Sequence, residues 1–223
     1  NTPIKTKASV VISFQLFGTL LCFICSHFSA GEGNLNQRID NYKTTVGSIT
    51  LPRRLQNKKR AMSSDKTENF DCVFWLGDLN FLTTKERDRV ERKVLDVKYR
   101  NSLNFEEIMN HDELYQAINS ERAFKNFLEG RITFEPTYKY DVNSDKYDTS
   151  EKCRIPSYTV HIEFFSEKKN ILFVKLNIIC FFLINRIVFS TGVAIREQYH
   201  VRSTMPSRTL NCRITGPCTV CTR

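Results

Sequence analysis

The stretch FWLGDLNF, residues 74–81, decides how this chain is expected to fold. An apolar run is followed by Gly77, Asp78 and Asn80, which predicts a buried strand that ends in a carboxylate and an amide. Open α/β sheets carry their chemistry at the carboxyl ends of their strands. Because Asp-x-Asn also forms ordinary turns, the pair alone does not decide between a turn and a catalytic site.

The length of 223 residues suffices for one domain with a sizeable core, and the net charge of +9 suggests acidic partners. That charge is unevenly spread. Residues 160–223 hold nine basic and three acidic side chains, so residues 1–159 contribute only +3. The sequence therefore does not support a domain-wide nucleic-acid footprint, and we expect no nucleic-acid partner.

The eight cysteines form no pattern typical of a small disulfide-rich domain, so we interpret them as free thiols in a reducing compartment. The pair Cys218-x-x-Cys221 is compatible with redox or zinc chemistry, but it lacks a matching second pair. The aspartates between Asp141 and Asp148 lack the glycine and the bidentate glutamate of a calcium loop.

The apolar run over residues 8–25 imitates a signal peptide, because Lys5 and Lys7 precede it and small residues follow it. A break at Gly18, with β-branched and aromatic residues on both sides, favours a hairpin instead. We expect strands over residues 9–17 and 20–26, so that His27 stands at the end of the second strand. A secreted or membrane protein remains the alternative.

Apolar periodicity predicts further elements along the chain. They are helices over residues 34–45 and 84–97, a helix from 104 to 124 that Gly130 ends, and a strand over 132–141. Residues 52–69 carry basic clusters among small polar residues and predict a solvated, mobile insertion. A nuclear signal and a contact with anionic lipid are alternative interpretations of those clusters.

Three cations lie on predicted loops near an aromatic side chain: Tyr138, Lys139, Lys152 and Arg154. Such a set suits a multiply phosphorylated ligand, because guanidinium and ammonium groups bind phosphate oxygens with charge-assisted hydrogen bonds.

Four blocks together resemble the inositol polyphosphate 5-phosphatase family, a branch of the DNase I-like endonuclease/exonuclease/phosphatase fold. In order along the chain they are residues 25–31, 74–81, 136–152 and 154–159. Each block alone is modest, but all four match in order and spacing over residues 4–159. The type IV phosphatidylinositol polyphosphate 5-phosphatases are the most similar branch.

The resemblance implies an α/β chain, a partial four-layer sandwich. It also implies Mg²⁺-dependent removal of the 5-phosphate from PtdIns(4,5)P2 or PtdIns(3,4,5)P3. The implied partners are phosphoinositide head groups at a membrane surface, and the implied location is cytoplasmic and peripheral to membranes. The upstream part of the sandwich, with the glutamate that holds Mg²⁺, is expected to lie before Asn1.

The resemblance also assigns roles. Asp78 and Asn80 would orient the attacking water and the scissile phosphate, and His27 would hydrogen-bond that phosphate. The groups expected to grip the neighbouring 4-phosphate are Tyr138, Lys139, Lys152 and Arg154. Such an in-line displacement needs positioned groups and fixed positive charge around the phosphoryl oxygens.

Residues 160–223 depart from the family, so we expect the partial catalytic domain to cover residues 1–159. The run over 171–189 is rich in residues with AT-rich codons, and polar residues interrupt it too often for a convincing membrane span. Read in a shifted frame, codons for residues 211–221 permit the family motif Ser-Asp-His-Arg-Pro-Val. We therefore predict a retained intron followed by a frame-shifted exon.

The lost motif carries the Asp-His pair that the family uses as general base. His161 and His200 lack the motif context to replace it, so little or no hydrolysis is expected from this chain. The alternatives are a non-catalytic phosphoinositide-binding fragment and a nuclease of the same fold. The compact cationic set disfavours a nuclease, which needs a basic or aromatic track.

Overall fold

The computed structural model of the chain describes residues 7–50, 64–166 and 219–222. The chain divides into two units, and the described residues belong to the first, Asn1–Glu167 with Pro217–Arg223. The second unit, Lys168–Gly216, lies outside the described residues.

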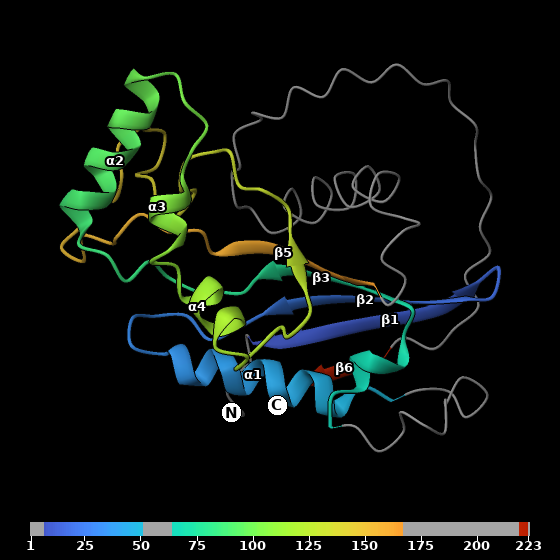
Figure 1. Cartoon of the computed structure of the whole chain (residues 1–223). Helices are drawn as coiled ribbons and strands as arrows, with labels where there is room; N and C mark the ends of the chain where they lie inside the picture. Colours follow the sequence, from blue (N-terminus) through green and yellow to red (C-terminus); the bar gives the residue numbers. More distant parts are fainter. Residues whose placement is uncertain (1–6, 51–63, 167–218, 223) are drawn as a thin grey trace, which may run out of the picture. The chain divides into compact units, whose positions relative to one another are not determined.

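One six-stranded mixed sheet organises this unit (Figure 1), in the order β4-β5-β3-β2-β1-β6. Its strands are β1 (Ala8–Leu16), β2 (Thr19–His27), β3 (Cys72–Asp78), β4 (Leu128–Glu129), β5 (Val160–Ser166) and β6 (Thr219–Thr222). Strands β2 and β3 pair in parallel, and the other neighbours pair antiparallel. With its helices the sheet forms an α/β unit, which confirms the predicted fold class.

The N-terminal apolar run forms the predicted hairpin. Phe17 and Gly18 both adopt positive φ, +46° and +82°, as a two-residue turn with matching strand twist requires. The turn fixes the register, so Ala8 lies opposite His27 at the far end of the hairpin. Among the described residues, no helix has the length and apolar character needed to cross a bilayer.

The predicted strand of residues 74–81 is β3, buried along most of its length and parallel to β2. Near its end Gly77 adopts a φ of +133°, and a Cβ there would lie 2.1 Å from the Ser26 carbonyl oxygen. Only glycine lets the two backbones approach this closely. The parallel pairing brings the carboxyl ends of β2 and β3 to one edge, with His27 opposite Asp78.

Four α-helices and a short 3₁₀ helix accompany the sheet. They are α1 (Leu35–Ser48), η2 (Lys66–Asn69), α2 (Arg87–Tyr99), α3 (Glu106–Met109) and α4 (Glu113–Asn119). The main core lies on the face where Trp75, fully buried, stacks with Tyr42 of α1 and meets Phe124 edge-on. Burial of such aromatic surface is the main stabilisation of this face.

The other face carries a row of aromatic rings across four strands. Phe14, Phe23, Phe74 and Phe164 follow one another with centroid distances of 5.8, 4.9 and 4.9 Å. Because strand residues two apart share a face, the side chains of His27 and Asp78 stand on this same face.

A second, smaller core holds the segments that carry the predicted phosphate ligands. Val90, Val94 and Val97 of α2 pack with Ile108 of α3 and with Tyr158. Phe134 and Tyr158 meet edge-on at 5.8 Å, and the Tyr158 hydroxyl donates to the Phe134 carbonyl. The strand predicted over residues 132–141 is wrong, because the region forms only isolated bridges, Tyr138 with Ser157 and Tyr140 with Tyr147. Packing against this core explains why the residues alternate in hydrophobicity without forming a strand.

Two helix predictions need correction. The helix expected over residues 84–97 begins at Arg87, because the N–H and hydroxyl of Thr84 both donate to the His111 carbonyl. The helix expected from 104 to 124 is two short helices, because Asp112 caps α4 by accepting from the N–H groups of Leu114 and Tyr115. The prediction for 34–45 is confirmed by α1.

The prediction of a solvated, mobile insertion over residues 52–69 is wrong for its last residues, 65–69. Asp65 caps η2, where its carboxylate accepts from the Thr67 N–H, and Thr67 and Asn69 are buried. Residues 52–63 lie outside the described part. Among the cysteines whose side chains the structure describes, Cys22, Cys25, Cys72 and Cys153, none forms a disulfide bond.

The sheet continues past the predicted end of the domain at residue 159. Residues 160–166 form β5, which lies between β3 and β4. Whether residue 160 also marks an intron boundary stays a prediction about the gene. Residues 167–218, including the apolar run over 171–189 and His200, lie outside the described part.

Candidate active site

The sheet edge at the ends of β2 and β3 brings an imidazole to a carboxylate. His27 and Asp78 are register partners, and Nε2 of His27 lies 3.7 Å from Oδ2 of Asp78. The backbone closes this edge, since the Phe28 N–H donates to the Asp78 carbonyl at 3.0 Å. The two side chains are 47% and 35% exposed, so a ligand in solution can reach both.

Asn80 completes this edge in a strained but well-held turn. Its φ is +56°, in the left-handed region that asparagine tolerates better than most residues. The N–H groups of Leu79 and Asn80 both donate to the Thr159 carbonyl, at 2.8 and 3.1 Å. The side-chain amide donates to the Phe28 carbonyl at 3.2 Å, which fixes its orientation next to Asp78.

Asp78 holds an oxygen that no described group satisfies. Its Oδ1 is buried and has no hydrogen-bond partner in the described part of the chain. A buried unpaired carboxylate oxygen is costly unless an ion, a water molecule or a substrate proton takes it. At this edge Asp78 therefore has an acceptor oxygen available to a ligand.

Lys7 adds a cation that the sequence analysis did not assign to the site. Its ammonium donates to Nε2 of His27 at 2.6 Å, so a neutral ring carries its proton on Nδ1. Partial burial lowers the pKa of Lys7, and the charge of Asp78 acts to raise it. The hairpin register offered the clue, because a two-residue turn that pairs Ala8 with His27 also brings the preceding residue there.

The predicted cationic groups meet around a second acid that the sequence analysis missed. Asp148 is buried, its Oδ1 lies 3.6 Å from the Lys139 ammonium, and its Oδ2 accepts from the Arg154 N–H. Hydrogen bonds from Ser150 and from the Arg154 backbone hold the pKa of Asp148 at about 2. Asp148 therefore stays ionised and fixes the loop that presents Lys139 and Arg154.

Contacts also join this loop to the sheet edge. The Arg154 guanidinium lies 3.9 Å from the Glu32 carboxylate, in the loop that follows His27. Tyr138 exchanges two backbone hydrogen bonds with Ser157, two residues before the carbonyl that holds Asn80. Lys152 is exposed and forms no ion pair within the described residues. Glu32 has no local sequence signal, because its partner Arg154 is distant in the chain.

The residues present fit a magnesium ion in part. Mg²⁺ takes oxygen ligands and is commonly bound through one or two carboxylates together with substrate phosphates. Asp78, with its unpartnered Oδ1, supplies one such carboxylate at this edge.

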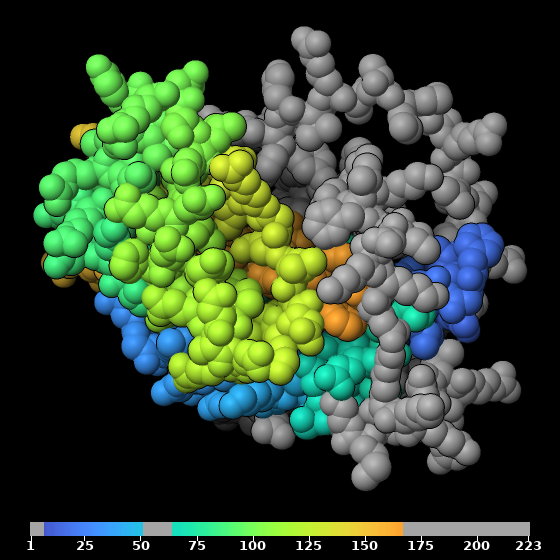
Figure 2. Space-filling model, viewed as in Figure 1, coloured from blue at the N-terminus to red at the C-terminus, as the bar shows by residue number. Residues whose placement is uncertain are grey.

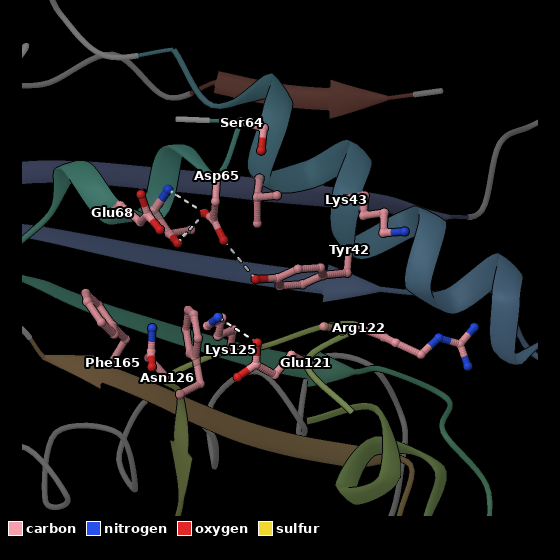
Figure 3. Close-up of a pocket in the computed structure, with 14 residues that line it drawn as sticks. Tyr42, Lys43, Ser64, Asp65, Glu68, Glu121, Arg122, Lys125, Asn126 and Phe165 are labelled. Carbon is pink, nitrogen blue, oxygen red and sulfur yellow. Dashed lines mark hydrogen bonds and ion pairs between the residues drawn. The ribbon is translucent and has the colours of Figure 1, made fainter. Parts of the chain in front are cut away.

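A hollow in the described part of the chain lies elsewhere. Figure 3 shows it lined by α1, η2 and the segment after α4, and none of the predicted site residues lines it. Its polar groups already have partners, since the Tyr42 hydroxyl donates to Asp65 and the Lys125 ammonium pairs with Glu121. It therefore does not compete with the sheet edge as the candidate active site.

A strand-end carboxylate and amide, an imidazole and a cationic loop thus lie together on an α/β sheet. The chain belongs to Endonuclease/Exonuclease/phosphatase family 2, whose sequence profile matches residues 2–188. It is 37% identical over 170 residues to mouse phosphatidylinositol polyphosphate 5-phosphatase type IV, covering 75% of this chain and 26% of that protein. The predicted resemblance is confirmed.

Two solved structures share the fold. The inositol polyphosphate 5-phosphatase domain of SPsynaptojanin, solved in complex with inositol (1,4)-bisphosphate and calcium, matches with a TM-score of 0.60 and 31% identity. The match covers 75% of this chain and 45% of that domain. A Cimex nitrophorin in its ferrous NO complex matches with a TM-score of 0.50 and 25% identity over 72% of this chain and 49% of the nitrophorin. The fold alone therefore does not determine the function, which must be argued from the residues of the site.

Proposed function

We propose that this chain carries the substrate-binding edge of a Mg²⁺-dependent phosphoinositide 5-phosphatase. The observation that carries the proposal is the meeting of His27 and Asp78 at one sheet edge, where Oδ1 of Asp78 has no partner among the described residues and the Asn80 amide is held in place. The proposed substrates are PtdIns(4,5)P2 and PtdIns(3,4,5)P3, met at the cytoplasmic surface of a membrane. The relatives are named as phosphatases of this kind, and the free thiols suit a reducing compartment.

At the sheet edge the scissile phosphate would lie against His27 and Asn80. Asp78 would accept a hydrogen bond from the attacking water and orient it for in-line displacement. Lys7 sits against His27 and adds fixed positive charge close to the phosphoryl oxygens, where it stabilises developing negative charge. A bound Mg²⁺ ion would supply further charge neutralisation, with Asp78 as a protein ligand.

The cationic loop would recognise a second phosphate on the inositol ring. Asp148 lies 3.6 Å from the Lys139 ammonium and holds the backbone of Arg154, whose guanidinium lies 3.9 Å from Glu32, so these contacts position both cations before a ligand arrives. Lys152, exposed on the same loop, and Tyr138 would complete the contact with the 4-phosphate. Pre-positioned cations lose less side-chain entropy on binding, which favours affinity.

We further propose that the chain binds this ligand without efficient turnover. The general base expected from the family motif has no replacement in His161. That ring is fully buried, and both of its nitrogens already have partners, Glu129 and the Tyr158 carbonyl. His200 lies outside the described residues.

The test uses the full 223-residue chain. Isothermal titration with inositol (1,4)-bisphosphate should show binding, and phosphate release from short-chain PtdIns(4,5)P2 with Mg²⁺ should stay at background. The double variant K139A/R154A should lose binding, whereas K125A, which removes an exposed cation outside the site, should not. Turnover would refute the catalytic deficit alone. Absent binding would refute the proposed site, and equal binding of duplex DNA would favour a nuclease.

A further inference from the structure

Three side chains on β4 and β5 converge at a second place, away from the candidate active site. Glu129, His161 and Glu163 each offer one ligand atom, and these atoms all lie within 4.8 Å of one another. His161 and Glu163 stand two residues apart on β5, so they share a face of the sheet. Glu129 is the cross-strand partner of Glu163.

This cluster lies on the helix-packed face of the sheet. Glu163 is the register partner of Trp75, whose side chain belongs to the main core. Asp78 stands three residues after Trp75 on β3, so its side chain lies on the opposite face of the sheet. In the space-filling view the segment that contains β4 lies beside and in front of β5 (Figure 2).

Glu163 is fully buried, and neither of its carboxylate oxygens has a hydrogen-bond partner in the described part of the chain. Burial and the negative charge of Glu129 raise the pKa of Glu163. A second buried acid, Asp112, also acts on Glu163 and leaves its Oδ2 unpartnered. A buried carboxylate without hydrogen bonds, next to two further acids, requires compensation by a proton or a cation.

His161 has the hydrogen bonding of a metal ligand. Its Nε2 lies 2.6 Å from the Tyr158 carbonyl, and its Nδ1 lies 2.9 Å from Oε1 of Glu129. Ligating histidines usually donate their second N–H to a carbonyl or carboxylate, which fixes the ring and its tautomer. Although burial lowers it, the charge of Glu129 raises the pKa of His161, so the metal-free ring also carries a proton on Nδ1, which donates to Glu129. A metal ion bound by Nδ1 would take the place of that proton.

We propose that Glu129, His161 and Glu163 bind one divalent transition-metal ion, with Zn²⁺ as the expected occupant. Ligand atoms around tetrahedral zinc lie about 3.3 Å apart, so binding would draw the three ligand atoms together by at most about 1.5 Å. One imidazole and two carboxylates suit zinc, and Glu129, 21% exposed, provides the route of entry. The ion would fasten β4 to β5. This proposal does not depend on the proposed phosphatase function.

The chain contains one tryptophan, which makes the test direct. Trp75 lies opposite Glu163, and cross-strand partners have Cβ atoms about 5 Å apart. A Co²⁺ ion in the cluster should therefore quench the Trp75 fluorescence, and Zn²⁺ should reverse the quenching. After removal of metal by chelation, the full chain should retain one Zn²⁺ per molecule through gel filtration, measured by mass spectrometry.

The variants E163Q and H161Q should bind Co²⁺ and Zn²⁺ at least about tenfold more weakly. The matched controls E151Q and H111Q, outside the cluster, should behave as the wild type. Without metal E163Q should melt no lower than the wild type, which separates lost binding from lost folding. The proposal would be overturned if E163Q retained as much metal as the wild type, or if Co²⁺ left the Trp75 fluorescence of the wild type unchanged. The charge of the buried carboxylates would then be compensated by protons.

Discussion

Two carboxylates on neighbouring strands leave oxygens without partners in the described part of the chain, yet their settings differ. Asp78, at the end of β3, is 35% exposed and faces the aromatic row. Glu163, in the middle of β5, is fully buried on the face that packs against the helices. A ligand or an ion can reach Asp78 at its partly exposed edge, whereas Glu163 destabilises the fold unless a proton or metal ion joins it. Exposure therefore decides whether an unpaired acid indicates a ligand site or a stability problem.

The change expected to damage both regions most is G77A. Gly77 precedes Asp78 and lies opposite His161, and an added Cβ would meet the Ser26 backbone. We expect a loss of about 3 kcal/mol or more in the free energy of unfolding, because backbone atoms cannot move aside. Urea denaturation measures it. G130A, where a Cβ meets nothing within 4 Å, should stay within about 0.5 kcal/mol, and equal effects would contradict the account.

The buried cluster should make stability depend on pH. Burial raises the pKa of Glu163 to about 8, and despite burial the charge of Glu129 raises that of His161 to about 9. Both groups bind protons more tightly in the folded state, so their stabilisation is complete at low pH and is lost as pH rises toward 9. The metal-free chain should lose at least about 3 kcal/mol between pH 5 and pH 9, which is the linkage free energy of one of these groups alone.

Thermal melts of the chelated chain across this pH range measure that loss. E163Q should flatten the profile and E151Q should not. A melting temperature of the wild type that rises from pH 5 to pH 9 would contradict the raised pKa values of this cluster.

The exposed region should respond in ligand affinity rather than stability. K139A removes a 47% exposed ammonium and should weaken inositol (1,4)-bisphosphate binding about tenfold, equivalent to about 1.4 kcal/mol, with an unchanged melting temperature. Titration calorimetry in low and high salt measures both the loss and its screening. Unchanged affinity in K139A would remove the cationic loop from the binding site.

The smallest effect on stability is expected at Asp78 itself. D78N keeps the size of the side chain, and its Oδ2 is already solvated in part, so the free energy of unfolding should change by no more than about 0.5 kcal/mol. Urea denaturation of D78N beside E163Q makes the comparison direct. A loss at D78N larger than the change at E163Q would reverse the roles assigned to the two acids.

Local patterns predicted the parts of the fold that depend on neighbouring residues. The hairpin, β3 and α1 follow from apolar alternation, glycine at the turn and helical periodicity. The meeting of His27 with Asp78 was expected from the family resemblance alone, and the parallel pairing of β2 with β3 brings the two residues opposite each other. Other long-range pairs did not follow from local patterns, and Glu32 and Lys7 became visible only when the chain folded around them.

The failures have the same origin. Residues 132–141 alternate because they line a small core with Tyr158, and a strand with no neighbour in the sheet cannot form. The cluster of Glu129, His161 and Glu163 joins two strands 32 residues apart, so no local sequence motif predicts it.

The most direct test of the candidate active site labels the histidine rings with ¹⁵N and follows them by NMR during addition of inositol (1,4)-bisphosphate. H27Q assigns the His27 signals, and H161Q assigns those of His161. The account predicts that the His27 ring resonances shift with the ligand to saturation while those of the buried His161 stay in place. Unmoved His27 resonances at saturating ligand, or a shift confined to His161, would contradict it.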